Sequence, residues 1–176
     1  PTTPKVSPPF NEMMTPSSLG SLEHETNMIT TRTDSPEETL ALGRRLSSVL
    51  RPGDVVLLGG RLGTGKTLLT VGSADGLGVP DPIVSPTFVI ARVYLDGFLP
   101  LVHADVYRLG SILEFEDLDL EETAARGVLV IEWGEAIEDA VSPDRLVIEI
   151  EIDGTLEYRV RQAGADPLIF VPIVDF

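Results

Sequence analysis

The chain reads Gly60-Arg61-Leu62-Gly63-Thr64-Gly65-Lys66-Thr67 directly after the apolar run Val55-Val56-Leu57-Leu58. This order fits the phosphate-binding pattern G-x-x-x-x-G-K-[ST], in which a strand leads into a glycine-rich loop and a helix follows. The glycines let backbone N–H groups point inward, and the helix begins with its positive end at the phosphates. We expect Lys66 to reach the β- and γ-phosphates and the Thr67 hydroxyl to ligate Mg²⁺. The pattern therefore predicts a nucleoside triphosphate site.

Length and composition fit a single domain. The chain has 176 residues, of which 43% are hydrophobic, and this is enough for a core. It has no cysteine, which excludes a disulfide framework and thiolate metal sites. No apolar run approaches the roughly 18 residues that a membrane span needs. We therefore expect a cytoplasmic protein without a membrane partner.

The net charge is −15. Affinity for nucleic acid comes mainly from clustered lysine and arginine, so we expect no direct, tight binding of nucleic acid. Residues 114–122 contain six acids among nine residues. They fit either the solvated face of a helix or a docking surface for a basic patch on a partner.

The chain divides into an extension, a domain and a tail. Residues 1–30 are rich in Pro, Ser and Thr without a hydrophobic period, so we expect a disordered extension there. We expect the P-loop domain over residues 31–165, beginning with a helix capped by Ser35-Pro36-Glu37-Glu38. A helix after the phosphate loop should run to about Leu77. The tail, residues 166–176, has no predicted placement.

Apolar alternation, turn residues and capping boxes predict the elements of the second half. We expect a hairpin of 88–94 with 98–103, an acidic helix opened by Ser111, a buried strand at 128–131, a short helix at 135–141, and a hairpin of 146–152 with 156–161. Pro100 should place its strand at an edge or bulge, or trim its start. The order predicts an α/β fold: a small P-loop NTPase sandwich with a mixed, mainly parallel central sheet and β-hairpin additions.

Two acids are candidates to complete a Mg²⁺ site beside the loop. Glu132 follows the buried strand, at the carboxyl edge where α/β sheets bind ligands. It could ligate the metal through water or orient the attacking water. Asp105 closes the second strand of the first hairpin and could hold the metal or position a water. The alternatives are a solvent-exposed acid for Glu132 and a turn or capping acid for Asp105.

Four segments together resemble the TsaE (YjeE) family. They are the phosphate loop, Ser85-Pro86-Thr87-Phe88, His103-Ala104-Asp105-Val106-Tyr107-Arg108-Leu109, and Ile131-Glu132-Trp133-Gly134-Glu135. The resemblance spans roughly residues 35–161. Two positions depart from the usual family pattern: Arg61 stands where an acid is common, and Gly134 stands where proline is common. Neither departure removes a phosphate or metal ligand, although Arg61 reverses a charge near the nucleotide.

The resemblance implies a complete set of site residues. The implied nucleotide-binding residues are Gly60, Arg61, Leu62, Gly63, Thr64, Gly65, Lys66, Thr67, Thr39, Ser85, Thr87 and Trp133. The implied metal ligands are Thr67, Glu132 and Asp105, and the implied catalytic residues are Asp105 and Glu132. Ser85 and Thr87 match a switch-like segment that responds to the γ-phosphate, and Thr39 matches a position near the adenine. Core packing is an equal alternative for Trp133, and His103 is more often structural than catalytic.

The resemblance also implies cofactors and partners. The family consists of small bacterial ATPases required to make threonylcarbamoyladenosine beside the anticodon of certain tRNAs. Such an ATPase binds ATP and Mg²⁺, docks on a complex of TsaB and TsaD, and resets that complex between turnovers. The tRNA is then reached only through the complex. We expect weak ATPase activity alone and stimulation by the partners.

Two other classes of function share the loop. A small-molecule P-loop kinase needs an acceptor pocket and usually an arginine-bearing lid, but the later arginines are scattered and no long insertion could form a lid. A non-enzymatic nucleotide-sensing module needs the same ligands as a slow ATPase. A GTPase is less compatible, because no Asn-Lys-x-Asp base-reading motif occurs.

Overall fold

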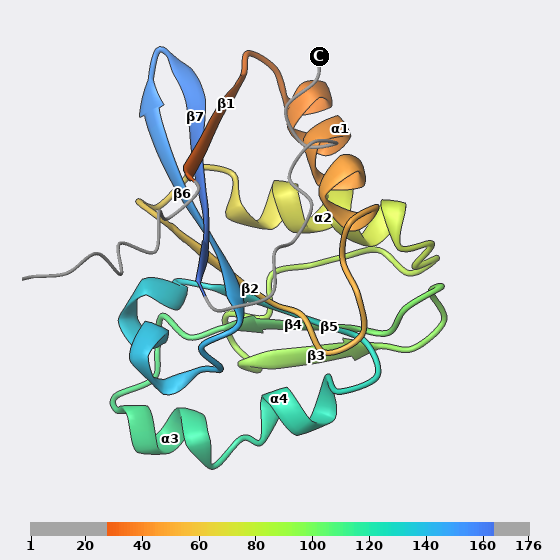
Figure 1. Ribbon diagram of the computed structural model, residues 1–176, viewed down its shortest axis with the longest axis vertical. Coiled ribbons are helices and arrows are strands. Elements are labelled where there is room, and N and C mark those ends of the chain that lie inside the picture. Colours follow the sequence, from red (N-terminus) through yellow and green to blue (C-terminus); the bar gives the residue numbers. More distant parts are fainter. Residues whose placement is uncertain (1–27, 164–176) are drawn as a thin grey trace, which may run out of the picture.

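The computed structural model describes residues 28–163, which form one mixed sheet with helices on both faces (Figure 1). The elements are β1 (Met28–Thr33), α1 (Pro36–Ser47), β2 (Val55–Gly60), α2 (Lys66–Gly76), β3 (Ala91–Tyr94), β4 (Leu101–Asp105), α3 (Ile112–Glu116), α4 (Leu120–Thr123), β5 (Val128–Glu132), the 3-10 helix η2 (Gly134–Ala140), β6 (Arg145–Asp153) and β7 (Thr155–Ala163). The expected α/β sandwich is confirmed. No helix of the described part has the length and apolar composition to cross a bilayer.

The sheet has seven strands in the order β1-β7-β6-β2-β5-β4-β3. Its centre is parallel, since β2 pairs in parallel with both β5 and β6, and β5 pairs in parallel with β4. The outer strands β3, β7 and β1 are antiparallel to their neighbours. Both expected hairpins are therefore present, β3 with β4 and β6 with β7. The parallel centre brings the carboxyl ends of β2, β4 and β5 to one edge.

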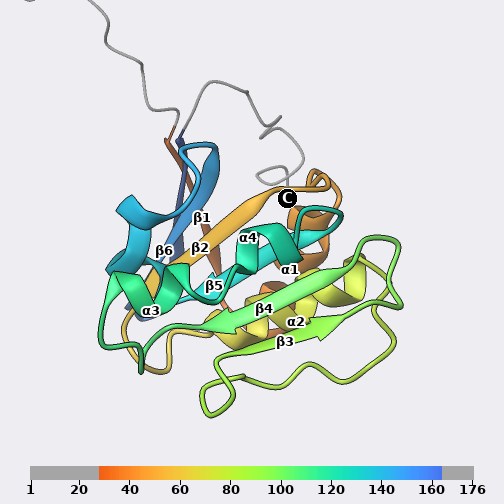
Figure 2. The same cartoon turned by 90° about the horizontal axis from the view of Figure 1, so that it is seen from below.

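Helices cover the two faces differently (Figures 1 and 2). The long helices α1 and α2 lie on one face, over a core that includes Val56 and Leu58 of β2. The short helices α3, α4 and η2 lie on the other face, over a core that includes Val55 and Leu57. All four of these β2 side chains are buried, as expected for a strand with a helical layer on each side. This burial fixes the strand that leads into the phosphate loop.

The N-terminal boundary differs from the expectation. Strand β1 begins at Met28, three residues inside the segment 1–30 that we expected to be disordered. The strand alternates between buried and exposed residues, but the buried ones are Thr31 and Thr33. Because threonine is not apolar, the sequence shows no hydrophobic alternation there. Residues 1–27 and 164–176 lie outside the described residues. Our expectations for the rest of the extension, the domain end at 165 and the tail 166–176 therefore stay predictions.

The local signals around the first helices are confirmed. Ser35 caps α1 by accepting a 3.2 Å hydrogen bond from the Glu38 backbone N–H, and Pro36 occupies the first turn. The Glu38 carboxylate accepts a 2.7 Å bond from the Asp34 N–H, which completes the capping box one residue earlier than usual. Helix α2 ends at Gly76, one residue before the expected Leu77.

Two predicted elements are shorter than expected. The first strand of the β3–β4 hairpin starts at Ala91 rather than at residue 88, because the Ile90 N–H bonds to the Pro86 carbonyl at 2.7 Å and closes a turn. Pro100 trims the start of β4, which begins at Leu101. The acidic helix is divided into α3 and α4 by Asp119, which has a φ of 47°. The acids therefore do not form one continuous helical face.

Helices α1 and α2 approach each other closely through glycines. A Cβ built on Gly43 would lie 2.5 Å from the Leu69 carbonyl oxygen and 2.6 Å from the Ser73 nitrogen. A Cβ on Gly72 would likewise meet the backbone of Leu40. Backbone atoms cannot move aside as a flexible side chain can, so the packing of the two helices requires glycine at these positions.

We predict that Gly43→Ala lowers the free energy of unfolding by about 1–3 kcal/mol through overpacking. The better helix propensity of alanine, about 1 kcal/mol, opposes this loss only in part. Gly110→Ala is the matched control, because its nearest contact would be the flexible Glu114 carboxylate at 3.4 Å. Urea denaturation measures both variants. Equal stability of the two variants would contradict the proposed constraint at the helix contact.

Candidate nucleotide-binding site

The phosphate loop joins β2 to α2 through three glycines with positive φ. The φ values are 125° at Gly60, 81° at Gly63 and 87° at Gly65. L side chains rarely adopt such values, so the curl of the loop requires glycine. Gly60 also lies against the Ile150 carbonyl, which leaves no room for a Cβ. Lys66 opens α2, and the N–H groups of its first turn therefore face the loop.

The Lys66 side chain is held inside the loop and is only 5% exposed. Its Nζ donates to the Gly60 carbonyl at 2.6 Å and to the Arg61 carbonyl at 2.9 Å. It also lies 3.7 Å from the centroid of the Trp133 ring, a cation–π contact. Burial lowers the pKa of Lys66, and the negative charges of Glu132, Glu135 and Asp105 oppose that change. The surrounding acids thus favour the charged ammonium that a phosphate site needs.

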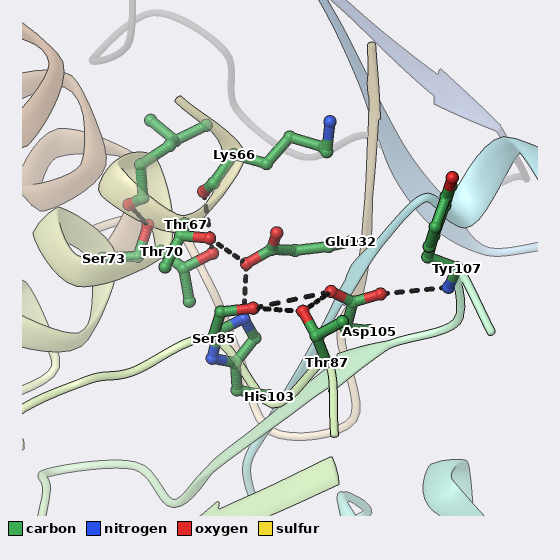
Figure 3. Close-up of polar contacts among 11 residues, drawn as sticks. Lys66, Thr67, Thr70, Ser73, Ser85, Thr87, His103, Asp105, Tyr107 and Glu132 are labelled. Carbon is green, nitrogen blue, oxygen red and sulfur yellow. Dashed lines mark hydrogen bonds and ion pairs between the residues drawn. The ribbon is translucent and has the colours of Figure 1, made fainter. Parts of the chain in front are cut away.

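Thr67 and Glu132 meet between α2 and the end of β5 (Figure 3). The Thr67 hydroxyl donates to Glu132 Oε1 at 2.7 Å, and His103 Nε2 lies 2.8 Å from the same oxygen. Glu132 is 3% exposed and His103 is fully buried. The histidine Nδ1 is buried without a hydrogen-bond partner among the described residues. The tautomer of His103 that fits these contacts carries its proton on Nε2 and none on Nδ1, because its single N–H then donates to Glu132.

Asp105 is held by a different segment of the chain (Figure 3). Its Oδ2 accepts from the Thr87 hydroxyl at 2.6 Å and from the Ser85 hydroxyl at 3.5 Å, and the two hydroxyls are 2.7 Å apart. Its Oδ1 accepts from the Tyr107 backbone N–H at 3.0 Å. The segment that carries Ser85 and Thr87 ends at Ile90, whose φ of 68° is strained for a β-branched residue. Asp105 therefore connects β4 to a strained loop.

These groups surround a cavity of about 430 Å³. Most of the predicted site residues line it; the lining set is Leu62, Gly63, Thr64, Gly65, Lys66, Thr67, Ser85, Thr87, Asp105, Tyr107, Arg108, Glu132 and Trp133. An adjoining cavity of about 850 Å³ shares Leu62, Thr64 and Trp133 with the first and is also lined by Gly60 and Arg61. Arg61 therefore faces the second cavity, which also has three glutamates in its lining.

Thr39 is not brought to the loop. Its side chain is fully buried and hydrogen-bonds to the Tyr158 hydroxyl at 3.0 Å and the Thr33 hydroxyl at 2.9 Å. These three hydroxyls tie α1 to β1 and β7. These contacts give Thr39 a structural role, and its expected place near the adenine stays a prediction.

Trp133 combines both interpretations that the sequence left open. Its ring packs against the core beside β5 and also lines both cavities, over Lys66 and 4.8 Å from the Tyr107 ring centroid. Its φ of 64° lies in the left-handed region. Proline at position 134, which is common in the family, would disfavour a helical conformation of the residue before it, Trp133. Glycine at position 134 places no such restriction on the left-handed conformation of Trp133.

The residues fit a Mg²⁺–triphosphate. The loop offers inward N–H groups and an ammonium, and the two buried carboxylates with the Thr67 hydroxyl are the oxygen donors that Mg²⁺ prefers. Two further side chains belong to the site: His103 contacts Glu132, and Arg108 lines the cavity. The His103-Ala104-Asp105 spacing was a usable signal, because alternate residues of a strand project to the same face.

Comparison with known proteins identifies the family of the chain. The family model for "Threonylcarbamoyl adenosine biosynthesis protein TsaE" matches residues 33–162, most of the described chain. The chain belongs to the TsaE family. The match contains all four segments on which the resemblance depends, which confirms the family predicted from sequence.

Individual TsaE relatives cover most of the domain. A Streptomyces coelicolor protein is 52% identical over 113 residues, 62% of this chain and 76% of that protein. A Bacillus subtilis protein is 45% identical over 130 residues, 73% of this chain and 81% of that protein. Both are named tRNA threonylcarbamoyladenosine biosynthesis protein TsaE. The crystal structure of Bacillus subtilis YdiB matches with a TM-score of 0.66 and 36% identity, covering 80% of this chain and 89% of that one.

We predict that the hydrogen bond from His103 contributes to stability through Glu132. His103→Leu removes a donor from a buried carboxylate and should lower the free energy of unfolding by about 1–3 kcal/mol. His103→Gln keeps an N–H donor and should lose less. Urea denaturation of these variants in wild-type and Glu132→Gln backgrounds gives the coupling energy between the two positions. A coupling energy near zero would show that the hydrogen bond contributes nothing.

Proposed function

We propose that this chain is a Mg²⁺-dependent ATPase that docks on a TsaB–TsaD pair and resets it between turnovers in tRNA threonylcarbamoyladenosine biosynthesis. The observation that carries the proposal is the 2.7 Å hydrogen bond between the Thr67 hydroxyl and Glu132 Oε1. This bond joins the hydroxyl of the phosphate loop to a carboxylate at the end of the neighbouring strand. P-loop enzymes hold Mg²⁺ with such a hydroxyl and such a carboxylate. Membership of the TsaE family supports the pathway.

Binding of the triphosphate depends on the loop and the helix behind it. The loop N–H groups and those at the N-terminus of α2 would donate hydrogen bonds to the phosphate oxygens, and Lys66 would offset part of the phosphate charge. Mg²⁺, held by Thr67 and Glu132, would neutralise charge on the phosphates. The absence of a guanine-reading motif supports ATP as the nucleotide.

Hydrolysis depends on the two buried carboxylates. Glu132 is fixed from two sides by Thr67 and His103, which suits a residue that keeps the metal in place. Asp105 lies in the same cavity and is held by Ser85 and Thr87. A carboxylate there can accept a hydrogen bond from a water that attacks the γ-phosphorus, and so orient it. Glu132 therefore acts mainly on the metal and Asp105 mainly on the water.

Dependence on partners follows from the way Asp105 is held. The Ser85–Thr87 segment is exposed at its hydroxyls and runs into the strained Ile90, so a docking protein can change its conformation. We therefore propose weak hydrolysis by the chain alone and faster hydrolysis on the TsaB–TsaD complex. The net charge of −15 supports contact with tRNA only through that complex.

Two alternatives use the same loop. The 850 Å³ cavity beside the loop is the observation that favours a small-molecule kinase, since an acceptor could occupy it. A nucleotide-sensing module would need only the binding residues. The alternatives differ from the proposal in the fate of the γ-phosphate. A kinase would transfer it to an acceptor, and a sensing module would leave it on the nucleotide.

The proposal predicts slow phosphate release from ATP by the chain alone and faster release with TsaB- and TsaD-type proteins and tRNA. Glu132→Gln keeps the shape and removes the charge, so it should retain ATP binding and lose about 10²-fold or more in release. Phosphate release is measured with and without the partners, together with a screen for phosphorylated nucleosides and sugars. Transfer faster to an acceptor than to water would identify a kinase, and binding without any release would identify a sensor.

Asp105→Asn tests the second carboxylate. Because the loop supplies most ground-state contacts, ATP binding should stay within a few-fold while partner-stimulated hydrolysis falls steeply. Thermal denaturation on the same preparation separates catalysis from folding. A variant that melts earlier but hydrolyses ATP at the normal rate per folded molecule would remove Asp105 from the catalytic set.

A further inference from the structure

Arg108 lies at the rim of the phosphate cavity. It follows β4 by three residues and lines the 430 Å³ cavity together with Lys66, Thr67, Asp105 and Glu132. Its guanidinium carbon is 4.5 Å from the centroid of the Phe88 ring, a cation–π contact. Phe88 is itself 84% exposed. Arg108 is therefore held at the mouth of the site by an exposed aromatic ring that does not pack in the hydrophobic core.

Arg108 has no carboxylate partner within residues 28–163, whereas several other arginines form ion pairs. Arg32, Arg44, Arg145, Arg159 and Arg161 are among the arginines that pair with a carboxylate. In a chain with a net charge of −15, an arginine that lines the same cavity as Asp105 and Glu132 without pairing to either needs an explanation. Hydrogen bonds from other groups already engage both oxygens of Asp105 and Oε1 of Glu132. The donors of Arg108 remain available to a ligand.

The chemistry of the cavity indicates which ligand. Lys66 and Arg108 are the two cationic side chains among its lining residues. A terminal phosphate carries roughly two negative charges near pH 7, and a planar guanidinium binds phosphate oxygens with two parallel hydrogen bonds. Lys66 is buried in the loop, where its Nζ donates to the Gly60 and Arg61 carbonyls. Beside Lys66 and Mg²⁺, the charge at the outer end of the triphosphate leaves room for a further cationic side chain.

We propose that Arg108 binds the γ-phosphate of ATP and is positioned for this contact by Phe88. The inference rests on the proposed function and deepens it. Phe88 directly follows Thr87, which donates to Asp105 at 2.6 Å. One short segment therefore contacts both the acid expected to orient water and the arginine expected to bind phosphate. A protein that docks on the exposed Phe88 ring would act on the γ-phosphate through Arg108.

The test is the ratio of ATP affinity to ADP affinity. In Arg108→Ala, affinity for ATP should fall about 10-fold or more, as expected when a charge-assisted hydrogen bond is lost. Affinity for ADP should change less than about 2-fold, because ADP lacks the γ-phosphate. Arg108→Lys should keep part of the preference for ATP over ADP, since lysine supplies the positive charge but not the two parallel hydrogen bonds of a guanidinium. Phe88→Ala should lower the ratio by a smaller factor.

The measurement is made on the full chain with ATP or ADP and Mg²⁺, using calorimetry and the fluorescence of Trp133, the one tryptophan of the chain. Arg92→Ala is the matched control, because Arg92 is an exposed arginine on β3 and is not among the residues that line either cavity. It should leave both affinities unchanged. Because Arg108 is exposed, its variants should fold normally.

The outcomes separate the inference from the proposed function. An unchanged ATP-to-ADP ratio in Arg108→Ala, whether both affinities fall together or neither falls, would overturn the role of Arg108 while leaving the nucleotide site intact. A wild-type chain that binds neither nucleotide would overturn both the inference and the proposed function. A loss confined to partner-stimulated hydrolysis, with normal ATP affinity, would overturn the phosphate contact and assign Arg108 to docking.

Discussion

The site depends on the register of three parallel strands. Leu58 of β2 and Asp105 of β4 both lie opposite Glu132 of β5, so the phosphate loop and the two carboxylates leave the sheet at one level. Side chains alternate between faces along a strand, so a shift of one residue would turn Glu132 away from Thr67. The register is secured by the apolar residues that precede these positions, which are buried on both faces. The hydrophobic core thereby specifies the position of the charged groups.

The two carboxylates are held by different parts of the fold. Glu132 hydrogen-bonds to residues of α2 and β4, which are regular elements packed on both sides. Asp105 hydrogen-bonds to a loop that includes Ser85 and Thr87 and ends in a strained residue. Regular elements open rarely and loops open readily, so the environment of Asp105 can change while that of Glu132 stays constant. The proposed ATPase would gain from this combination, because one carboxylate keeps its position while the surroundings of the other can change.

Much of this could be predicted from sequence, for reasons that particular residues illustrate. The phosphate loop was predictable because three glycines, a lysine and a threonine at fixed spacing leave few other solutions. The buried strand before Glu132 was predictable because its run is apolar throughout. Strand β1 was missed because threonines carry its alternation. The acidic helix does open at Ser111, but the left-handed residue Asp119, which depends on tertiary context, divides it into α3 and α4. Local patterns thus locate elements more reliably than their ends.

The site itself was predictable only in part. Most residues that the resemblance implied line one cavity, the loop, Glu132 and Asp105 among them, so the motifs located residues that the fold brings together, while their roles stay predictions. Thr39 does not line that cavity, and its burial in a cluster of hydroxyls could not be recognised from one threonine in a helix. The contacts of His103 and Arg108 are formed with residues 29 and 20 positions away, respectively. Such contacts depend on the folded arrangement of the strands and loops.

Strand β1 has a consequence for the handling of the chain. It pairs along its full length with β7 and so occupies the outer edge of the β6–β7 hairpin. A chain that began at Ser35 would lose this strand and present the free N–H and C=O groups of β7 to solvent. An uncovered strand edge is a template for pairing with another molecule. Removing the N-terminal segment to simplify the protein would therefore favour self-association, even though β1 contributes no side chain to the phosphate cavity.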